Sequence, residues 1–134
     1  MKLQTIITCL LLSVLFVNCK SEEEKTIDAF LLHAKNANLE AIKNISTLET
    51  KKYLTLIYEP ILQLGSAAAK QKLQQMASSI KCTLAYQMSK CSYIDKKGEQ
   101  RFFNISFVKK YDPSKEDLKL LIDIDKKYFF SEDE

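Results

Sequence analysis

The amino-acid sequence predicts an α+β domain in which N-terminal helices pack on one face of a C-terminal antiparallel meander sheet. The first observation is a helical period of apolar residues from Thr26 to about Ile80. The second is a period of two after about Lys81, which is typical of strands with one buried and one solvated face. The chain has 134 residues, enough for one domain and not for two.

Residues that favour helix caps separate the first apolar stripes. We expect Thr26 to cap a first helix, and Asn38 to cap a short second helix after the interruption at Asn36-Ala37-Asn38. The apolar stripe of the first helix is Ile27, Phe30, Leu31 and Ala34, and that of the second is Leu39, Ile42 and Ile45.

A third helical stretch runs from about Glu49 to Leu64, and a fourth helix follows it. Pro60 lacks a backbone donor, so it should kink or break the third stretch. Gly65 then ends this stretch and Ser66 caps the fourth helix. The predicted apolar faces are Leu54, Ile57, Ile61 and Leu64 for the third stretch, and Ala69, Leu73, Met76 and Ile80 for the fourth helix.

Two strands are predicted by apolar residues that alternate with polar ones. These residues are Phe103, Ile105 and Phe107 in the first strand, and Leu118, Leu120, Ile122 and Ile124 in the second. Residues 96–98 and 112–114 supply the turns before and between them. We expect residues 91–95 to pair across the first turn, while residues 81–89 fit either a strand or a helix end.

The N-terminus has the layout of a signal peptide, with a basic start, an apolar run and a polar break. The apolar run, Thr5 to Val17, is thirteen residues long and follows Lys2. Because about 20 apolar residues are needed to span a bilayer, this run is too short for a transmembrane helix. The alternative is an N-terminal helix buried in the domain.

The run Leu15-Phe16-Val17-Asn18-Cys19 resembles the lipobox of bacterial lipoproteins. Asn18 and Phe16 stand where the common motif has a small residue and Leu. The resemblance implies cleavage before Cys19, a thioether-linked diacylglyceryl group on its sulfur and an acyl chain such as palmitate on its amine. The predicted organisation is a signal peptide at 1–18, a polar tether at 19–25, a single domain at 26–130 and an acidic tail at 131–134.

A lipid anchor of this kind predicts the location of the protein and the surface it meets. Two acyl chains are sufficient for stable anchoring, so we expect the domain at the cell envelope, at the outer membrane or on the periplasmic face of a membrane. Residues 1–18 contain one Lys and no acid, so their removal lowers the net charge of +3 by one. A charge this small does not predict binding to nucleic acid.

The remaining cysteines form one candidate pair. Cys9 leaves with the signal peptide and Cys19 carries lipid, which leaves Cys82 and Cys91. Bridged Cα atoms lie within about 7 Å, whereas nine residues of continuous strand span about 30 Å. A disulfide therefore requires the chain to reverse near Tyr86-Gln87. The alternative is two unpaired buried thiols, and the spacing does not fit a zinc site.

The residues offer little for catalysis, so we expect no enzyme, no cofactor and no metal. His33 is the only histidine, and it lies beside the apolar stripe of the first helix, where a surface or cap role is expected. Gly65 and Gly98 are the only glycines, and two isolated glycines do not form a phosphate-binding loop.

The order of elements, with the run from Ala37 to Ser46, resembles the nuclear-transport-factor-like cone fold. In particular, the chain is similar to the small lipoproteins of that superfamily whose function is unknown. The resemblance spans most of residues 26–129, although the predicted helix at 66–80 is longer than this fold leads one to expect. The alternative is another α+β arrangement.

Some members of the cone-fold superfamily are isomerases that use an Asp base and a Tyr in an apolar cavity. By that resemblance the candidates are Asp123 and Asp125 with Tyr86 or Tyr93. However, both acids alternate with apolar residues of the last strand and so point away from its apolar face.

We therefore expect the domain to bind a small apolar ligand or a partner non-covalently. An open pocket between helices and sheet favours a ligand. A filled core favours the alternative, a structural or interaction protein of the envelope that acts through its surface. Aromatic residues that are hard to bury, such as Phe102, Phe129 and Phe130, favour a protein contact, whereas Phe103 and Phe107 are expected in the core.

Overall fold

The computed structural model describes residues 20–128, in which helices precede a four-stranded sheet. The predicted α+β class is confirmed. The helices are α2 (Glu22–Lys35), α3 (Leu39–Asn44), α4 (Leu48–Ile57), α5 (Glu59–Leu64) and α6 (Ala67–Ser78). The strands are β1 (Lys81–Ala85), β2 (Met88–Ile94), β3 (Gln100–Asp112) and β4 (Asp117–Ile124), and a 3-10 turn, η1, covers Lys126–Tyr128.

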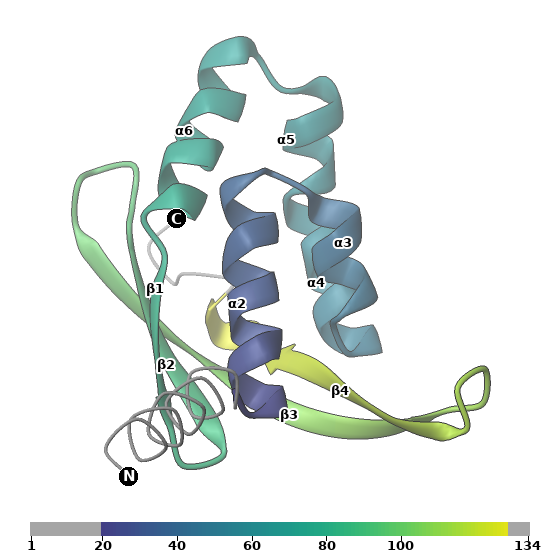
Figure 1. The fold of residues 1–134 in the computed structure, drawn as a ribbon. Helices are drawn as coiled ribbons and strands as arrows, with labels where there is room; N and C mark the ends of the chain where they lie inside the picture. The colour runs from purple at the N-terminus through teal and green to yellow at the C-terminus, as the bar shows by residue number, and fades with distance from the viewer. Residues whose placement is uncertain (1–19, 129–134) are drawn as a thin grey trace, which may run out of the picture.

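The sheet is a meander with the order β1-β2-β3-β4, and every neighbouring pair is antiparallel. The helices cover one face of it (Figure 1). Helix α2 lies against the sheet, while α5 and α6 extend beyond it. The far end of the β3–β4 hairpin projects away from the helices.

Helix α2 begins five residues earlier than predicted. Ser21, not Thr26, is its N-cap, and the Ser21 Oγ accepts the Glu24 N–H at 3.2 Å. Thr26 lies inside the helix and donates its hydroxyl to the Glu22 carbonyl at 2.8 Å. Three glutamates follow Ser21 in the first turn, where negative charge interacts favourably with the helix dipole. The last residues of the predicted polar tether are therefore helical.

The other predicted caps and breaks are confirmed. Asn38 caps α3 and Ser66 caps α6, each with a side-chain oxygen that accepts a backbone N–H three residues on. The third helical stretch divides into α4 and α5 at Tyr58, and Pro60 lies in the first turn of α5, where a missing N–H is tolerated. Leu64, predicted on the apolar face, is exposed because α5 extends beyond the sheet.

Gly65 ends α5 for a steric reason. A Cβ atom at this position would lie 2.3 Å from the carbonyl oxygen of Ile61, a distance that no side chain tolerates. The backbone conformation of Gly65 is itself unstrained, since its φ is −68°. Glycine is therefore required here by the close approach of the α5 backbone.

The ambiguous segment at 81–89 forms the β1–β2 hairpin. Its turn is Tyr86-Gln87, where the reversal was predicted, and Gln87 has a φ of 57°. Cys82 and Cys91 face each other across the two strands and are joined by a disulfide. The bond therefore links the edge strand to its neighbour, and Cys91 itself is buried in the core.

The core lies between the helices and the covered face of the sheet. Its buried residues are Ile27, Phe30, Ala34, Ile42, Leu54, Cys91, Phe103, Ile105, Ile122 and Ile124, and Phe107 is partly buried against them.

The prediction for β4 is only partly right. Leu118 is 60% exposed because the β3–β4 hairpin reaches beyond the helices, whereas Leu121, on the other face, is buried. Leu121 lies beside the edge where residues 45–47 pair with β4. There the Ile122 N–H donates to the Ile45 carbonyl at 2.8 Å, and the Thr47 N–H donates to the Ile122 carbonyl at 2.9 Å.

Several predictions fall outside the described residues. These are the signal peptide at 1–18, the lipidation site Cys19, the aromatic residues Phe129 and Phe130, and the acidic tail at 131–134. Between residues 20 and 128, no helix combines the length and apolarity that a bilayer crossing requires.

Candidate functional site

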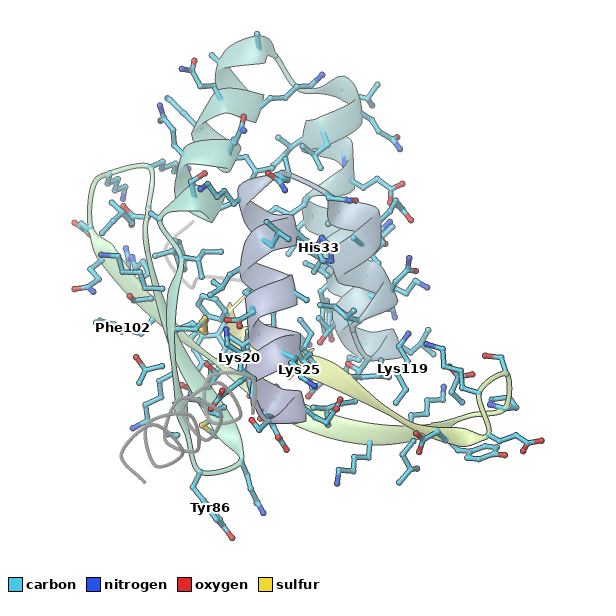
Figure 2. The ribbon with its side chains drawn as sticks, viewed as in Figure 1. Lys20, Lys25, His33, Tyr86, Phe102 and Lys119 are labelled. Carbon is cyan, nitrogen blue, oxygen red and sulfur yellow. A yellow bond between two sulfur atoms is a disulfide. The ribbon has the colours of Figure 1, made fainter. Side chains whose placement is uncertain are left out.

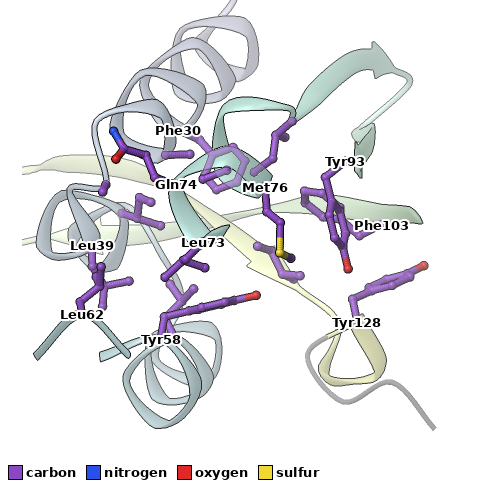
Figure 3. Close-up of a pocket in the computed structure, with 17 residues that line it drawn as sticks. Phe30, Leu39, Tyr58, Leu62, Leu73, Gln74, Met76, Tyr93, Phe103 and Tyr128 are labelled. Carbon is purple, nitrogen blue, oxygen red and sulfur yellow. The ribbon is translucent and has the colours of Figure 1, made fainter. Parts of the chain in front are cut away.

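An apolar cavity lies between the helices and the sheet. Its volume is about 140 Å³. The side chains that line it are shown in Figure 3. The lining residues are Phe30, Ala34, Ala37, Leu39, Ile42, Leu54, Tyr58, Leu62, Leu73, Gln74, Met76, Ala77, Ile80, Tyr93, Phe103, Ile124 and Tyr128.

The position of α6 creates the cavity. The apolar stripe of this helix contributes Leu73, Met76 and Ala77 to the lining, yet no residue of α6 is fully buried. The opposite wall comes from the apolar stripe of α2, whose Phe30 and Ala34 are buried. Helix α6 therefore covers the core without filling the space above it, and its apolar face borders a void.

Aromatic rings form the sheet side of the cavity. The ring of Phe103 lies at the centre of this aromatic cluster, with centroid distances of 6.0 Å to Tyr93 and 6.5 Å to both Phe30 and Tyr128. These are distances at which aromatic pairs contact each other edge to face. The cluster joins α2, β2, β3 and η1, so this wall is held by four separate elements.

The polar groups of the lining are neutral. They are the hydroxyls of Tyr58, Tyr93 and Tyr128 and the amide of Gln74. Burial raises the pKa of Tyr58 to about 12, with a smaller contribution from Tyr93. The Tyr128 hydroxyl accepts a hydrogen bond from the Asn104 side-chain amide at 3.3 Å. Within the described part of the chain, no Asp, Glu, Lys, Arg or His lines the cavity.

Two residues of the cavity lining are also exposed to solvent. Ala37, in the turn after α2, and Gln74, on α6, are both exposed. The volume resembles that of apolar protein cavities that take in benzene, about 150 Å³. It is smaller than the range of about 300–1,000 Å³ that holds drug-sized ligands. A ligand that fits is therefore a small molecule or one short segment of a longer one.

The residues predicted for an isomerase-like site are not brought together. Asp123 accepts hydrogen bonds from the hydroxyls of Thr47 at 2.5 Å and Thr50 at 3.3 Å, outside the cavity. Asp125 is exposed and accepts the Lys127 N–H at 3.0 Å. Of the two candidate tyrosines, only Tyr93 lines the cavity.

Tyr86 and Phe102 lie on the surface, away from the cavity. Tyr86 is 91% exposed at the tip of the β1–β2 hairpin (Figure 2). Phe102 is 68% exposed on the face of the sheet that the helices leave open, as its phase in β3 predicted. His33 is partly buried in the last turn of α2. Over residues 20–128, no three His, Cys, Asp or Glu side chains are grouped as metal ligands.

Of the lining residues, the sequence suggested only Tyr93 as a candidate for an isomerase-like site. The stripe of Leu73, Met76 and Ile80 was visible as a helical period, but the period predicts only which face is covered. Tyr58 lies at the break between α4 and α5, which Pro60 signalled. Tyr128 follows the last strand and carries no pattern that distinguishes it.

Comparison with known proteins gives no relative. Neither the models of protein families, nor the curated proteins, nor the solved structures contain a match to this chain. The lipobox and the cone-like fold therefore stay predictions from resemblance. The geometry of the cavity is the basis on which a function can be argued.

Proposed function

We propose that this chain is a lipid-anchored protein of the cell envelope whose domain binds a small apolar ligand non-covalently. The observation that carries the ligand proposal is the apolar cavity between α2, α6 and the sheet. Apolar surface that stays open to water loses about 25 cal/mol per Å² relative to burial. A ligand that fills the cavity recovers that free energy, and the lining offers no charged group that opposes it.

The anchoring proposal rests on the sequence before the domain and on the disulfide. Disulfides persist in oxidising compartments such as the bacterial periplasm, where an envelope protein folds. The structure joins Cys82 to Cys91. The lipobox-like run ends at Cys19, and the N-cap of α2 is Ser21, so only Lys20 stands between the modified residue and the cap.

Mass spectrometry of protein extracted from its own cell envelope tests both parts. We expect a denatured mass that corresponds to a chain starting at Cys19 with added acyl groups and two fewer hydrogens. We expect the native spectrum to show an additional, non-covalently bound mass. A chain that starts elsewhere and carries no lipid contradicts the anchor, and a native mass without any addition after incubation with small apolar compounds contradicts the ligand.

A second candidate function is an envelope interaction protein that acts through the open face of the sheet. The observation that favours it is the exposure of Phe102, Ile94 and Val108 on this face. Exposed aromatic residues are enriched where proteins bind each other. Under this hypothesis Phe102→Ser abolishes cross-linking to a partner in intact cells, whereas Tyr86→Ser at the distant hairpin tip does not. Equal cross-linking in both variants contradicts it.

A further inference from the structure

The two sides of the cavity differ in chemistry. Leu39 and Leu62 lie on one side in Figure 3, and Tyr93 and Tyr128 lie on the other. The hydroxyl of Tyr58 is directed from the leucine side toward the tyrosine side. A ligand that fills the cavity therefore meets alkyl groups at one end and phenol groups at the other.

The phenol groups provide hydrogen bonds without charge. A protonated phenol both donates and accepts a hydrogen bond. The raised pKa of Tyr58 keeps this group protonated at every pH that a cell reaches. Tyr128 accepts from Asn104 and, as a phenol, has a proton of its own to donate. This end of the cavity suits a ligand atom that accepts hydrogen bonds, such as a carbonyl or hydroxyl oxygen.

The cavity offers nothing that neutralises an anion. No described lining residue is cationic. Lys127 lies close, with its Nζ 5.0 Å from the ring centroid of Tyr128, but it is exposed and does not line the cavity. A carboxylate buried without a cation loses far more hydration free energy than a neutral carbonyl does. The walls therefore select against a charged head group.

We infer that the cavity binds a short aliphatic segment that ends in an uncharged hydrogen-bond acceptor, such as an ester or amide carbonyl, and rejects the corresponding carboxylate. This inference rests on the proposed function, because it names the chemical class of ligand for the same cavity. The aliphatic segment lies between Leu39, Leu62 and Leu73, and the acceptor lies toward Tyr58 and Tyr93.

A titration with three small ligands tests the inference. The purified full chain, labelled at its methyl groups, is titrated by NMR at neutral pH with hexanamide, hexanoate and benzene. We expect hexanamide to bind at least about tenfold more tightly than hexanoate, because a buried carboxylate lacks a cation. Benzene, which needs no hydrogen bond, is expected to bind as well, with shifts at the methyl groups of Leu73 and Met76.

Tyrosine variants separate the hydrogen bonds from the cavity itself. Removal of two hydroxyls in Y58F/Y93F is expected to weaken hexanamide binding about tenfold, at about 1 kcal/mol or less for each hydrogen bond. Benzene binding stays within about twofold by the same reasoning, because the rings remain. Tyr86→Phe, on the exposed hairpin tip, is the matched control and changes neither affinity.

The outcomes distinguish the two proposals. If none of the three ligands binds, the ligand function itself is wrong. If benzene binds but hexanoate binds as tightly as hexanamide in the natural chain, the cavity is a ligand site and only the selection against charge is wrong. Unchanged hexanamide binding in Y58F/Y93F likewise contradicts only the role of the phenols.

Discussion

The Lys43 ammonium group lies 2.9 Å from the Glu59 carboxylate and joins α3 to α5. Its side chain is only 7% exposed, and it also contacts Glu40 at 3.0 Å. The hydrogen bond that Lys43 donates to Glu59, followed by the one it donates to Glu40, raises the pKa of Lys43. The ion pair therefore connects two short helices, both of which contribute side chains to the cavity lining.

Removal of this ion pair is expected to destabilise the fold. Glu59→Ala leaves a largely buried ammonium group with one partner, so we expect the free energy of unfolding to fall by about 1–3 kcal/mol. Urea denaturation measures this change in the free energy of unfolding. Lys25→Ala is the matched control, since Lys25 is exposed and lies 4.0 Å from Glu22, and a loss below about 0.5 kcal/mol is expected there. Equal losses in the two variants contradict a structural role for the pair.

Loss of the disulfide is expected to lower stability without changing the fold. The bond closes a short loop between Cys82 and Cys91, whose chain-entropy contribution is about 2–3 kcal/mol. We expect the double variant C82A/C91A to unfold at a correspondingly lower urea concentration, and a reducing agent to shift the natural chain in the same direction. A reducing agent that shifts the double variant as well would show that the effect lies elsewhere.

Stability should decline at high pH because of Tyr58. The folded-state pKa of this phenol is raised to about 12, above its ordinary value of 10.0, so its contribution is fully present below pH 10 and is lost as the pH rises toward 12. In this range the free energy of unfolding falls by at most about 1.4 kcal/mol per pH unit. Urea denaturation between pH 9 and pH 12 measures it, and we expect a shallower decline in Tyr58→Phe. Identical dependence of stability on pH in the natural chain and in Tyr58→Phe contradicts this prediction.

A larger side chain on α6 should close the cavity. Ala77 lines the cavity, so Ala77→Leu is expected to abolish benzene binding and to change the free energy of unfolding by less than about 1.5 kcal/mol. Ala68→Leu is the control, because Ala68 is exposed on the same helix and does not line the cavity. Benzene binding that survives in Ala77→Leu shows that the ligand binds at another place.

Local chemistry made much of the fold predictable. Asn38 and Ser66 stand immediately before helical periods, and Pro60 and Gly65 act on the backbone through their own geometry, so each boundary is encoded within a few residues. The start of α2 was placed wrongly because Ser21 and Thr26 can both cap a helix. The choice between them depends on the glutamates that follow Ser21, whose favourable interaction with the helix dipole extends the helix by a turn.

Long-range relationships were not predictable in the same way. Leu118 and Ile122 have the same period, but only Ile122 lies under the helices, and the difference depends on where the β3–β4 hairpin leaves them. The backbone of Ile122 also pairs with residues 45–47, which are distant in sequence. The stripe of α6 predicted a covered face, but the separation between that face and the core is a property of packing that no period encodes.

The absence of fully buried residues from both α5 and α6 has a kinetic consequence. Segments with few buried contacts open locally at a free energy well below that of global unfolding. Backbone amides of these two helices should therefore exchange with deuterated solvent earlier than those of α2, whose Ile27, Phe30 and Ala34 are buried. Since the same helices form part of the cavity wall, the residence time of a ligand is governed by how often this pair of helices opens.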